Sequence, residues 1–424
     1  MPRDMTEKSA ILPDPAAPRP ARADAGVQAM ADALRQDDVF LRAVAHARET
    51  DERTLDDQME LTAVPAPPFG EAHRGERFSK LLSECARDVS TDAVGNVVGW
   101  RGRRDGAAPL VVAAHLDTVF PPDTDVHVTR AGEVLRGPGI GDDGRGLAVL
   151  LALGRAMEAA GVTLRRPLLM VGTVGEEGVG DLRGVRHLFD DEGEARSAAA
   201  FVSLDGAGMA RIVTRGVGSR RYRISVSGPG GHSWMDWGTP NPVHAMADAV
   251  SRMTREDTPG ATLTVGRIQG GISINAIPEE AWMEVDVRSM EEAPMAAQEA
   301  HILNAVESAV ARNQAAGRGS GTLSSAWERI GRRPAGATDD EELLVRAAVA
   351  ATRALGTTPQ LVASSTDANV PMDLGIPAVT LGGGGQAGQA HTLEEWYRNI
   401  EGPAGVARIL MTLMVLDRLL ALAD

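Results

Sequence analysis

The sequence predicts an α/β protein into which a second, smaller domain is inserted. Three observations support this prediction. Apolar strand-like segments and helix-like segments alternate up to about residue 215 and again after about residue 328. Between these positions the strands alternate polar and apolar residues, which is typical of a sheet with one covered face. His and carboxylate residues follow the apolar strands of the first domain, where open α/β sheets keep their active sites.

Length and composition limit the classes of protein. The chain has 424 residues, 43% hydrophobic and 24% charged, which is ordinary for a globular protein of two domains. The net charge of −15 repels phosphate backbones and anionic lipid, so we expect neither nucleic acid nor a membrane as partner. The single cysteine, Cys85, excludes an intramolecular disulfide. The chain lacks a membrane-length apolar run and a signal-peptide core, so we expect it in the cytoplasm.

The first domain is predicted in two pieces, 29–215 and 328–424. Residues 1–28 are rich in Pro, Ala and charge without periodicity, and we expect a disordered arm there. Asp339 or Asp340 is expected to cap the helix that ends at Gly356. Apolar runs predict strands at 109–115, 166–175, 198–206 and 376–385, and helical spacing predicts helices at 147–161, 339–356 and from about 403.

The inserted domain is predicted at 216–327. Its elements follow the order βαββαβ, which is that of a split-βαβ, ferredoxin-like sandwich. The strands are expected at 220–228, 261–268, 281–290 and 321–330, and the helices at 241–253 and 296–313.

Polar residues gather at the strand ends of the first domain. Carboxylates brought together there would repel one another and raise their own pKa values, and a bound cation relieves this repulsion. Two His with several carboxylates suit zinc, cobalt or manganese. The residues are His115 and Asp117, Asp142 and Asp143, Glu176 and Glu177, Asp205, and His391.

These residues lie in motifs that resemble one family, the zinc-dependent peptidases and deacylases that include peptidase T, glutamate carboxypeptidase and aminoacylase. The resemblance implies a zinc-exopeptidase-like α/β catalytic domain, and an inserted domain that serves as lid and dimerisation domain in a homodimer. The matching motifs occur in order: A-P-P-F-G-E-A-H-R (66–74), H-L-D-T (115–118), G-D-D (141–143), G-E-E-G (175–178), L-D (204–205), G-G-H-S (230–233) and His391.

The resemblance also implies a ligand set for two divalent ions, with zinc expected and cobalt or manganese possible. Asp142 would bridge the ions. His115 and Asp205 would complete one site, and Glu177 and His391 the other.

Around these ligands the resemblance implies further detail. Asp117 would fix the tautomer of His115 by a hydrogen bond to its other ring nitrogen. The peptide bond between Asp142 and Asp143 is expected to be cis. Relatives often carry Lys where this chain has Gly144, so the local loop geometry is expected to differ.

The expected chemistry is hydrolysis of an amide bond in small peptides. The two ions would activate a water, and Glu176 would take its proton and deliver it to the leaving amine. His232 would donate to the developing oxyanion, reaching across to the partner's site in a dimer. Asn275 and Arg288 match positions near the substrate's carbonyl and carboxylate ends, although a purely structural role stays open for both. Asp367 is expected behind the ligands.

Other classes fit less well. The segment G-P-G-I-G (137–141) imitates a dinucleotide loop, but two Asp residues follow where a pyrophosphate needs N–H groups. A nucleophilic serine is also disfavoured, because the segment around Ser233 reads G-H-S-W-M and lacks the second glycine of the G-x-S-x-G motif. An inactive binding protein and an N-acyl amino acid deacylase remain alternatives. Family peptidases tend to have Asp, and deacylases Glu, at the position of Asp205, which favours a di- or tripeptidase or another exopeptidase.

Overall fold

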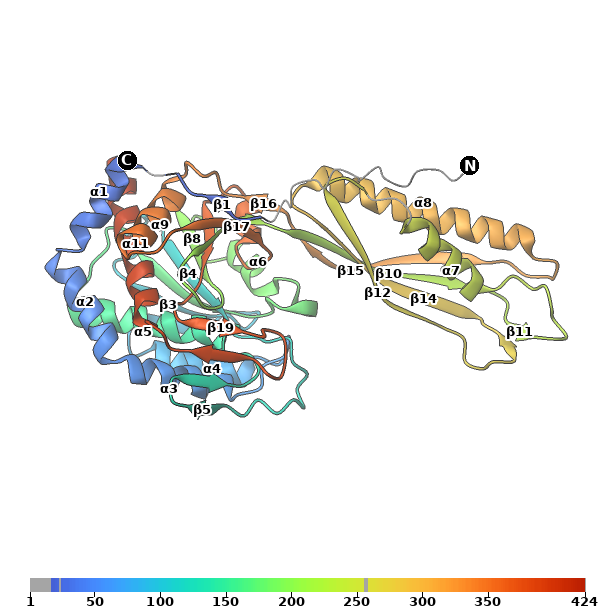
Figure 1. Cartoon of the computed structure of the whole chain (residues 1–424), viewed down its shortest axis with the longest axis horizontal. Helices are drawn as coiled ribbons and strands as arrows, with labels where there is room; N and C mark the ends of the chain where they lie inside the picture. The colour runs from blue at the N-terminus through green and yellow to red at the C-terminus, as the bar shows by residue number, and fades with distance from the viewer. Residues whose placement is uncertain (1–16, 23, 255–257, 424) are drawn as a thin grey trace, which may run out of the picture. The chain divides into compact units, whose positions relative to one another are not determined.

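The computed structural model describes residues 17–22, 24–254 and 258–423 (Figure 1). These residues form two compact units, one made of the chain up to Gly216 and from Ala337 onward, the other of Val217–Gly336. The expected end of the insertion at 327 falls inside a strand that continues to Arg333. Among the helices of the described ranges, none is long and apolar enough to cross a membrane.

The discontinuous unit is built on one mixed sheet with the order β1-β17-β9-β18-β8-β4-β7-β3-β2, and β16 pairs with β9. At its centre β4 lies between β7 and β8, parallel to both. All residues of these three strands are buried, which explains their continuous apolar sequences. The strands are β1 Arg19–Pro20, β2 Arg87–Thr91, β3 Val97–Arg101, β4 Leu110–His115, β7 Leu168–Thr173, β8 Ala200–Leu204, β9 Arg211–Gly216, β16 Gly336–Ala337, β17 Gln360–Ser364 and β18 Ala378–Leu381.

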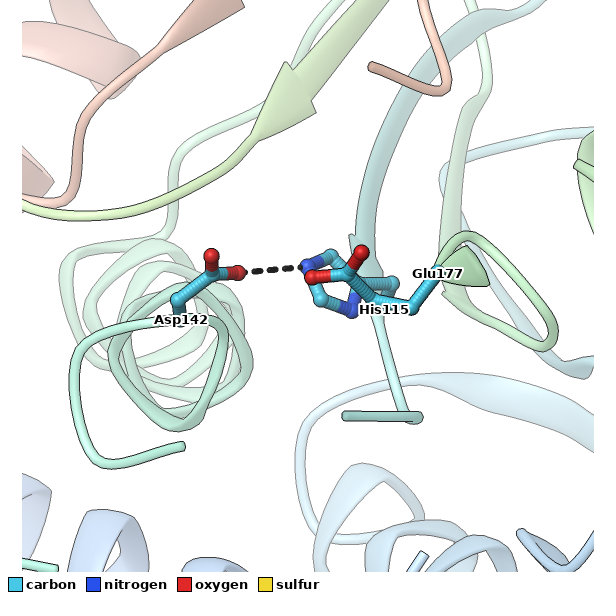
Figure 2. A group of neighbouring side chains, drawn as sticks. All are labelled: His115, Asp142 and Glu177. Carbon is cyan, nitrogen blue, oxygen red and sulfur yellow. Dashed lines mark hydrogen bonds and ion pairs between the residues drawn. The ribbon is translucent and has the colours of Figure 1, made fainter. Parts of the chain in front are cut away.

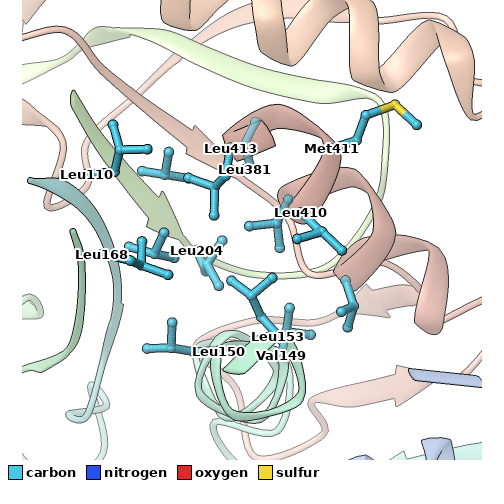
Figure 3. Packing of buried hydrophobic residues seen from close by; sticks show 14 of the residues in the cluster. Leu110, Val149, Leu150, Leu153, Leu168, Leu204, Leu381, Leu410, Met411 and Leu413 are labelled. Carbon is cyan, nitrogen blue, oxygen red and sulfur yellow. The ribbon is translucent and has the colours of Figure 1, made fainter. Parts of the chain in front are cut away.

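Helices cover both faces of this sheet. Seven helices contribute to the larger core (α1, α2, α3, α4, α5, α9 and α11), and α6 and α10 pack on the opposite face. Figure 3 shows strand leucines such as Leu110 and Leu204 in one cluster with Leu150 of α5 and Leu410 of α11. The helices are α1 Ala25–Leu34, α2 Asp38–Glu49, α3 Asp51–Thr62, α4 Ala72–Leu82, α5 Gly144–Ala160, α6 Arg183–Phe189, α9 Leu343–Ala354, α10 Asn369–Asp373 and α11 Pro403–Ala423, with a 3₁₀ turn η1 at Gly178–Gly180.

A small second sheet in the same unit brings distant segments together. Its order is β19-β20-β6-β5. Because β20 pairs with β6, the segment between β19 and β20, which carries His391, lies close to the loop that follows β6. The strands are β5 Thr129–Ala131, β6 Val134–Arg136, β19 Gln386–Gly388 and β20 Trp396–Arg398.

The prediction of a disordered arm over residues 1–28 is wrong for its described part. Strand β1 pairs antiparallel with β17, and α1 begins at Ala25 with the Asp24 side chain accepting from Val27 N. A strand of two residues is too short to show periodicity in the sequence. Its partner, β17, lies more than 300 residues further along the chain, so the pairing could not be predicted locally. Residues 1–16 lie outside the described residues.

The predicted cap of α9 is also wrong. The helix starts at Leu343 with Glu342 at the N-cap position and no side-chain cap. Asp339 instead accepts from Glu341 N, so its side chain stabilises the turn before the helix. By contrast, α5 ends at Ala160 with Gly161 as its C-cap (φ 68°), in agreement with the predicted end. It begins at Gly144, three residues before the predicted start, and Asp143 caps it by accepting from Gly146 N.

The inserted unit is a four-stranded antiparallel sheet with the order β12-β14-β10-β15. Helices α7 and α8 pack against one face, and residues along β14 alternate between buried and half-buried. The predicted α/β fold with an inserted βαββαβ sandwich is therefore confirmed. The elements are β10 Gly218–Ser227, β11 Gly231–His232, α7 Pro242–Met253, β12 Ala261–Gly270, β13 Ala276–Ile277, β14 Glu280–Ser289, α8 Glu292–Ala316 and β15 Ser324–Arg333.

Candidate metal centre

Three neighbouring parallel strands deliver polar side chains to one edge of the large sheet. His115 ends β4 and pairs in register with Thr173 of β7. Asp205 directly follows β8, whose Leu204 pairs with Ala114. Because parallel strands end at the same edge, the Glu176 and Glu177 turn after β7 lies there too.

Asp142 contacts both predicted histidine ligands, one with each carboxylate oxygen. Its Oδ1 lies 3.0 Å from His115 Nε2, and its Oδ2 lies 3.0 Å from His391 Nε2. His391 Nε2 is also 2.9 Å from Glu177 Oε1. Figure 2 shows His115, Asp142 and Glu177 facing one another. A carboxylate with one oxygen toward each imidazole has the arrangement that a bridging ligand needs.

Two overlapping groups in the described residues could hold a cation, and they share His115. One adds Asp142 and Glu177, the other Asp143 and Asp205, and in each group the ligand atoms lie within 4.8 Å of one another. The structure thus gathers all five predicted ligands, since His391 contacts two members of the first group.

The sequence placed Asp143 in the cluster but gave it no role. Its carboxylate accepts from the backbone N–H groups of His115, Gly146 and Gly206 at 3.0–3.3 Å. These bonds cap α5 and tie the start of that helix to the ends of β4 and β8. The bond between Asp142 and Asp143 is cis, as predicted.

The pKa values show how crowded the charges are. Burial, and then the charge of Asp142, raises the pKa of Asp205 to about 7. Hydrogen bonds that the His391 ring donates to the carboxylates of Asp142 and Glu177 raise the pKa of His391 to about 10. Burial alone would raise the pKa of Asp142, but the bonds to His115 and His391 hold it well below its usual range. A cation would replace the protons that the cluster otherwise keeps.

Asp117 lies behind His115, with a different contact from the one predicted. His115 Nδ1 lies 3.0 Å from the backbone carbonyl oxygen of Asp117 and 3.8 Å from its carboxylate. The carboxylate is occupied elsewhere, because it accepts from Glu176 N at 2.9 Å and Glu177 N at 2.7 Å. Asp117 therefore orients the imidazole through its backbone and the two-glutamate turn through its side chain. Burial raises the pKa of this carboxyl.

Asp367 and Gly144 lie next to the residues of the cluster. Asp367 is buried and accepts from Thr173 Oγ1 at 2.5 Å, directly behind the strand that leads to Glu176. A Cβ at Gly144 would collide with Thr62 Oγ1. The absence of a side chain at residue 144 is therefore a packing requirement at the start of α5.

In the inserted unit, His232 and Asn275 lie on adjoining segments. Strand β11 pairs with β13, and Ser233 N donates to the backbone oxygen of Asn275. His232 Nδ1 accepts from Trp234 N at 3.2 Å and Met235 N at 3.4 Å, which leaves the ring proton on Nε2. Asn275 Oδ1 accepts from Ser273 Oγ at 2.6 Å.

Arg288 lies on the sheet of the same unit, in register with Ser219 of β10 and Thr262 of β12. Its Nε donates to Asp286 at 2.7 Å. The structure thus gives Arg288 one defined contact, an ion pair with Asp286 that orients the guanidinium.

Sequence reasoning missed Glu395, whose side chain is 1% exposed. Its carboxylate accepts from Gly139, Gly141 and Asp142 backbone N–H groups. Burial raises its pKa to about 7, although these three bonds oppose the rise. The sequence carries no spacing signal for this role, because the loop it contacts is more than 250 residues away.

The chain is similar in sequence to known proteins. The profile of Peptidase family M20/M25/M40 matches residues 111–415, more than half of the chain. A succinyl-diaminopimelate desuccinylase of Corynebacterium glutamicum is 26% identical over 244 residues, 54% of this chain and 64% of that protein. The chain therefore spans less than two thirds of that relative.

Solved structures agree on the fold. Aminopeptidase PepT of Bacillus cereus superposes with a TM-score of 0.70 at 23% identity, and a Staphylococcus aureus tripeptidase with 0.73 at 21%. Each comparison covers 87% of this chain and 98% of the other.

Proposed function

The chain belongs to peptidase family M20/M25/M40, and from this premise we propose that it hydrolyses amide bonds in small peptides with the help of two divalent metal ions. The observation that carries the proposal is the convergence of two imidazoles and three carboxylates beside the ends of β4, β7 and β8. This donor set suits zinc, with cobalt or manganese as alternatives. Asp142 would be shared by both ions, with His115 and Asp205 on one side and Glu177 and His391 on the other.

The bound ions would supply an activated water and a polarised substrate carbonyl. Glu176 is proposed to take the proton of that water and to deliver it to the leaving amine. Asp117 holds the backbone of both glutamates, while Glu177 directs an oxygen at His391. Adjacent residues can therefore serve different roles, one as proton carrier and one as ligand.

The inserted unit is proposed to bind the substrate. His232 carries its proton on Nε2 and can donate it to the oxygen of the reacting carbonyl. Asn275, on the adjoining segment, would contact the same end of the substrate. Arg288, steadied by Asp286, would pair with a free carboxylate, which favours short peptides with an open terminus.

Removal of metal tests the proposal. We expect strong chelators to abolish hydrolysis of di- and tripeptides, and added zinc, cobalt or manganese to restore it. A panel that also contains N-acetyl and N-succinyl amino acids tests the alternative, an N-acyl deacylase, which the Corynebacterium relative favours. Full turnover after long incubation in excess chelator would refute the metal-dependent reaction.

The assembly is part of the same proposal. We expect a homodimer in which His232 of one chain serves the site of the other, with two equivalent sites. Inactive Glu176→Ala and His232→Ala chains, refolded together, would form about half mixed dimers, each with one intact site. About a quarter of the wild-type activity should return. Mixed dimers as inactive as either parent would contradict sharing. The cytoplasmic location stays a proposal that cell fractionation can test.

A further inference from the structure

Glu395 joins two loops that carry proposed metal ligands. It lies four residues after His391, in the segment that enters β20, and its side chain is 1% exposed. Its Oε2 accepts from Gly139 N at 2.9 Å, and its Oε1 accepts from Gly141 N at 2.7 Å and Asp142 N at 2.9 Å. One buried carboxylate thus binds the backbone of the loop that presents Asp142.

The loop from Gly139 to Asp142 depends on this carboxylate for most of its donors. The remaining backbone N–H, that of Ile140, donates to Gly137 O. The two segments also lie too close for a side chain at Gly141, where a Cβ would be 3.1 Å from Glu395 Oε1 and 2.9 Å from the Cβ of Ala387. A second link runs from Gly137 N to Glu395 O at 3.0 Å. The contact is therefore a close, fully hydrogen-bonded junction.

From this junction we propose that Glu395 is a positioning residue for the metal centre, holding Asp142 and His391 at the separation that one ion needs. The inference depends on the proposed metal-dependent function. His391 is 54% exposed in its side chain and approaches Asp142 and Glu177 from the Glu395 segment. If that segment moves, His391 moves relative to Asp142, whereas His115 stays anchored at the end of β4.

Three substitutions separate this role from a general loss of stability. Glu395→Gln keeps the shape but replaces one acceptor oxygen with a donor, so at least one loop N–H loses its partner. Glu395→Ala removes both oxygens. Glu394→Gln changes the same charge at the adjacent exposed residue and serves as matched control.

The first measurement is titration of metal-free protein with zinc. We expect Glu395→Gln to bind one of the two zinc equivalents about tenfold more weakly and Glu395→Ala about 100-fold more weakly, the range typical of residues behind the ligands. The weakened equivalent should be the one that His391→Ala loses. Glu394→Gln should bind both as the wild type does. Wild-type affinity for both equivalents in the Glu395 variants would overturn the proposal.

The second measurement does not require metal. Hydrogen exchange of residues 137–142 in metal-free protein should be faster in both Glu395 variants than in Glu394→Gln, while exchange in β4 stays unchanged. Unchanged exchange at 137–142 would overturn the proposal. If Glu395→Ala fails to fold, Glu395→Gln decides both measurements. If wild-type protein binds no zinc, the proposed function fails, and the exchange comparison still decides whether Glu395 holds the loop.

Discussion

The strand-end cluster of the discontinuous unit consists of His115, Asp117, Asp142, Asp143, Glu176, Glu177, Asp205 and His391. The tip of the inserted unit consists of β11 and β13 with the residues beside them, 231–237 and 272–277. Both regions carry proposed catalytic groups, in opposite settings. His115, Asp117 and Glu177 are buried, and each has defined hydrogen-bond partners. At the tip His232 is exposed, and its neighbours Trp234 and Ile274 are 84% and 102% exposed. Protein folding alone gives these three side chains their hydrogen-bond partners. The tip leaves large apolar side chains exposed, and these would gain packing partners only when something covers them.

The largest effect is expected inside the strand-end cluster. Glu176→Gln should lower kcat about 10²–10⁴-fold, because it removes the proton carrier. Metal content should stay at the wild-type value. Glu177→Gln, the neighbouring control, should lose one metal equivalent, as elemental analysis of the purified proteins can show. Equal metal loss in both variants would contradict the division of roles between Glu176 as proton carrier and Glu177 as metal ligand.

A somewhat smaller effect is expected at the tip. His232→Ala should lower kcat about 10²–10³-fold by removing a donor to the oxyanion. Its melting temperature should stay at the wild-type value because the side chain is exposed. His244→Ala, an exposed histidine on α7 of the same unit, is the control and should retain full activity. Loss of folding in His232→Ala would show that the His232 side chain contributes to stability. It would then contradict the difference between the buried cluster and the exposed tip.

The two regions should also differ in their response to truncation of apolar residues. Leu150→Ala in α5 removes a fully buried side chain and should lower the free energy of unfolding by about 2–5 kcal/mol. Ile274→Ala at the tip should change it by less than about 0.5 kcal/mol. Denaturant unfolding of both variants measures the difference. A cost at Ile274 as large as at Leu150 would mean that the tip is already covered in solution.

The smallest effect concerns pH, and it should come from the strand-end cluster together with Glu395. The pKa values of Asp205 and Glu395 are raised to about 7 and that of His391 to about 10. Groups with raised pKa values stabilise the folded state below their unfolded pKa and lose that contribution as pH rises through the folded value. Chelated protein should therefore melt at lower temperature at pH 8 than at pH 5. Zinc should remove or reverse this trend, and a stability that rises with pH in chelator would contradict it.

The sequence could predict what depends on local pattern. The apolar runs identified β4, β7 and β8, and the polar residues after them identified the cluster, because parallel strands end together. Contacts between distant segments left no such pattern. Glu395 looks like any loop carboxylate until β20 pairs with β6, and Asp117 was expected to use its carboxylate on His115 because the competing turn N–H groups were not visible. The end of the inserted unit moved because β15 pairs with β10 up to Arg333, beyond the alternating stretch.

Strand β1 has a consequence for how the protein behaves in solution. It covers the outer edge of β17, pairing Arg19 with Leu361 and Pro20 with Gln360. Proline has no N–H to offer to a further strand, so growth of the sheet stops there. A chain shortened to begin at Asp24 would expose the backbone of β17 as a template for another molecule. Such a shortened protein should form larger particles in light scattering on storage, even while its metal centre remains intact.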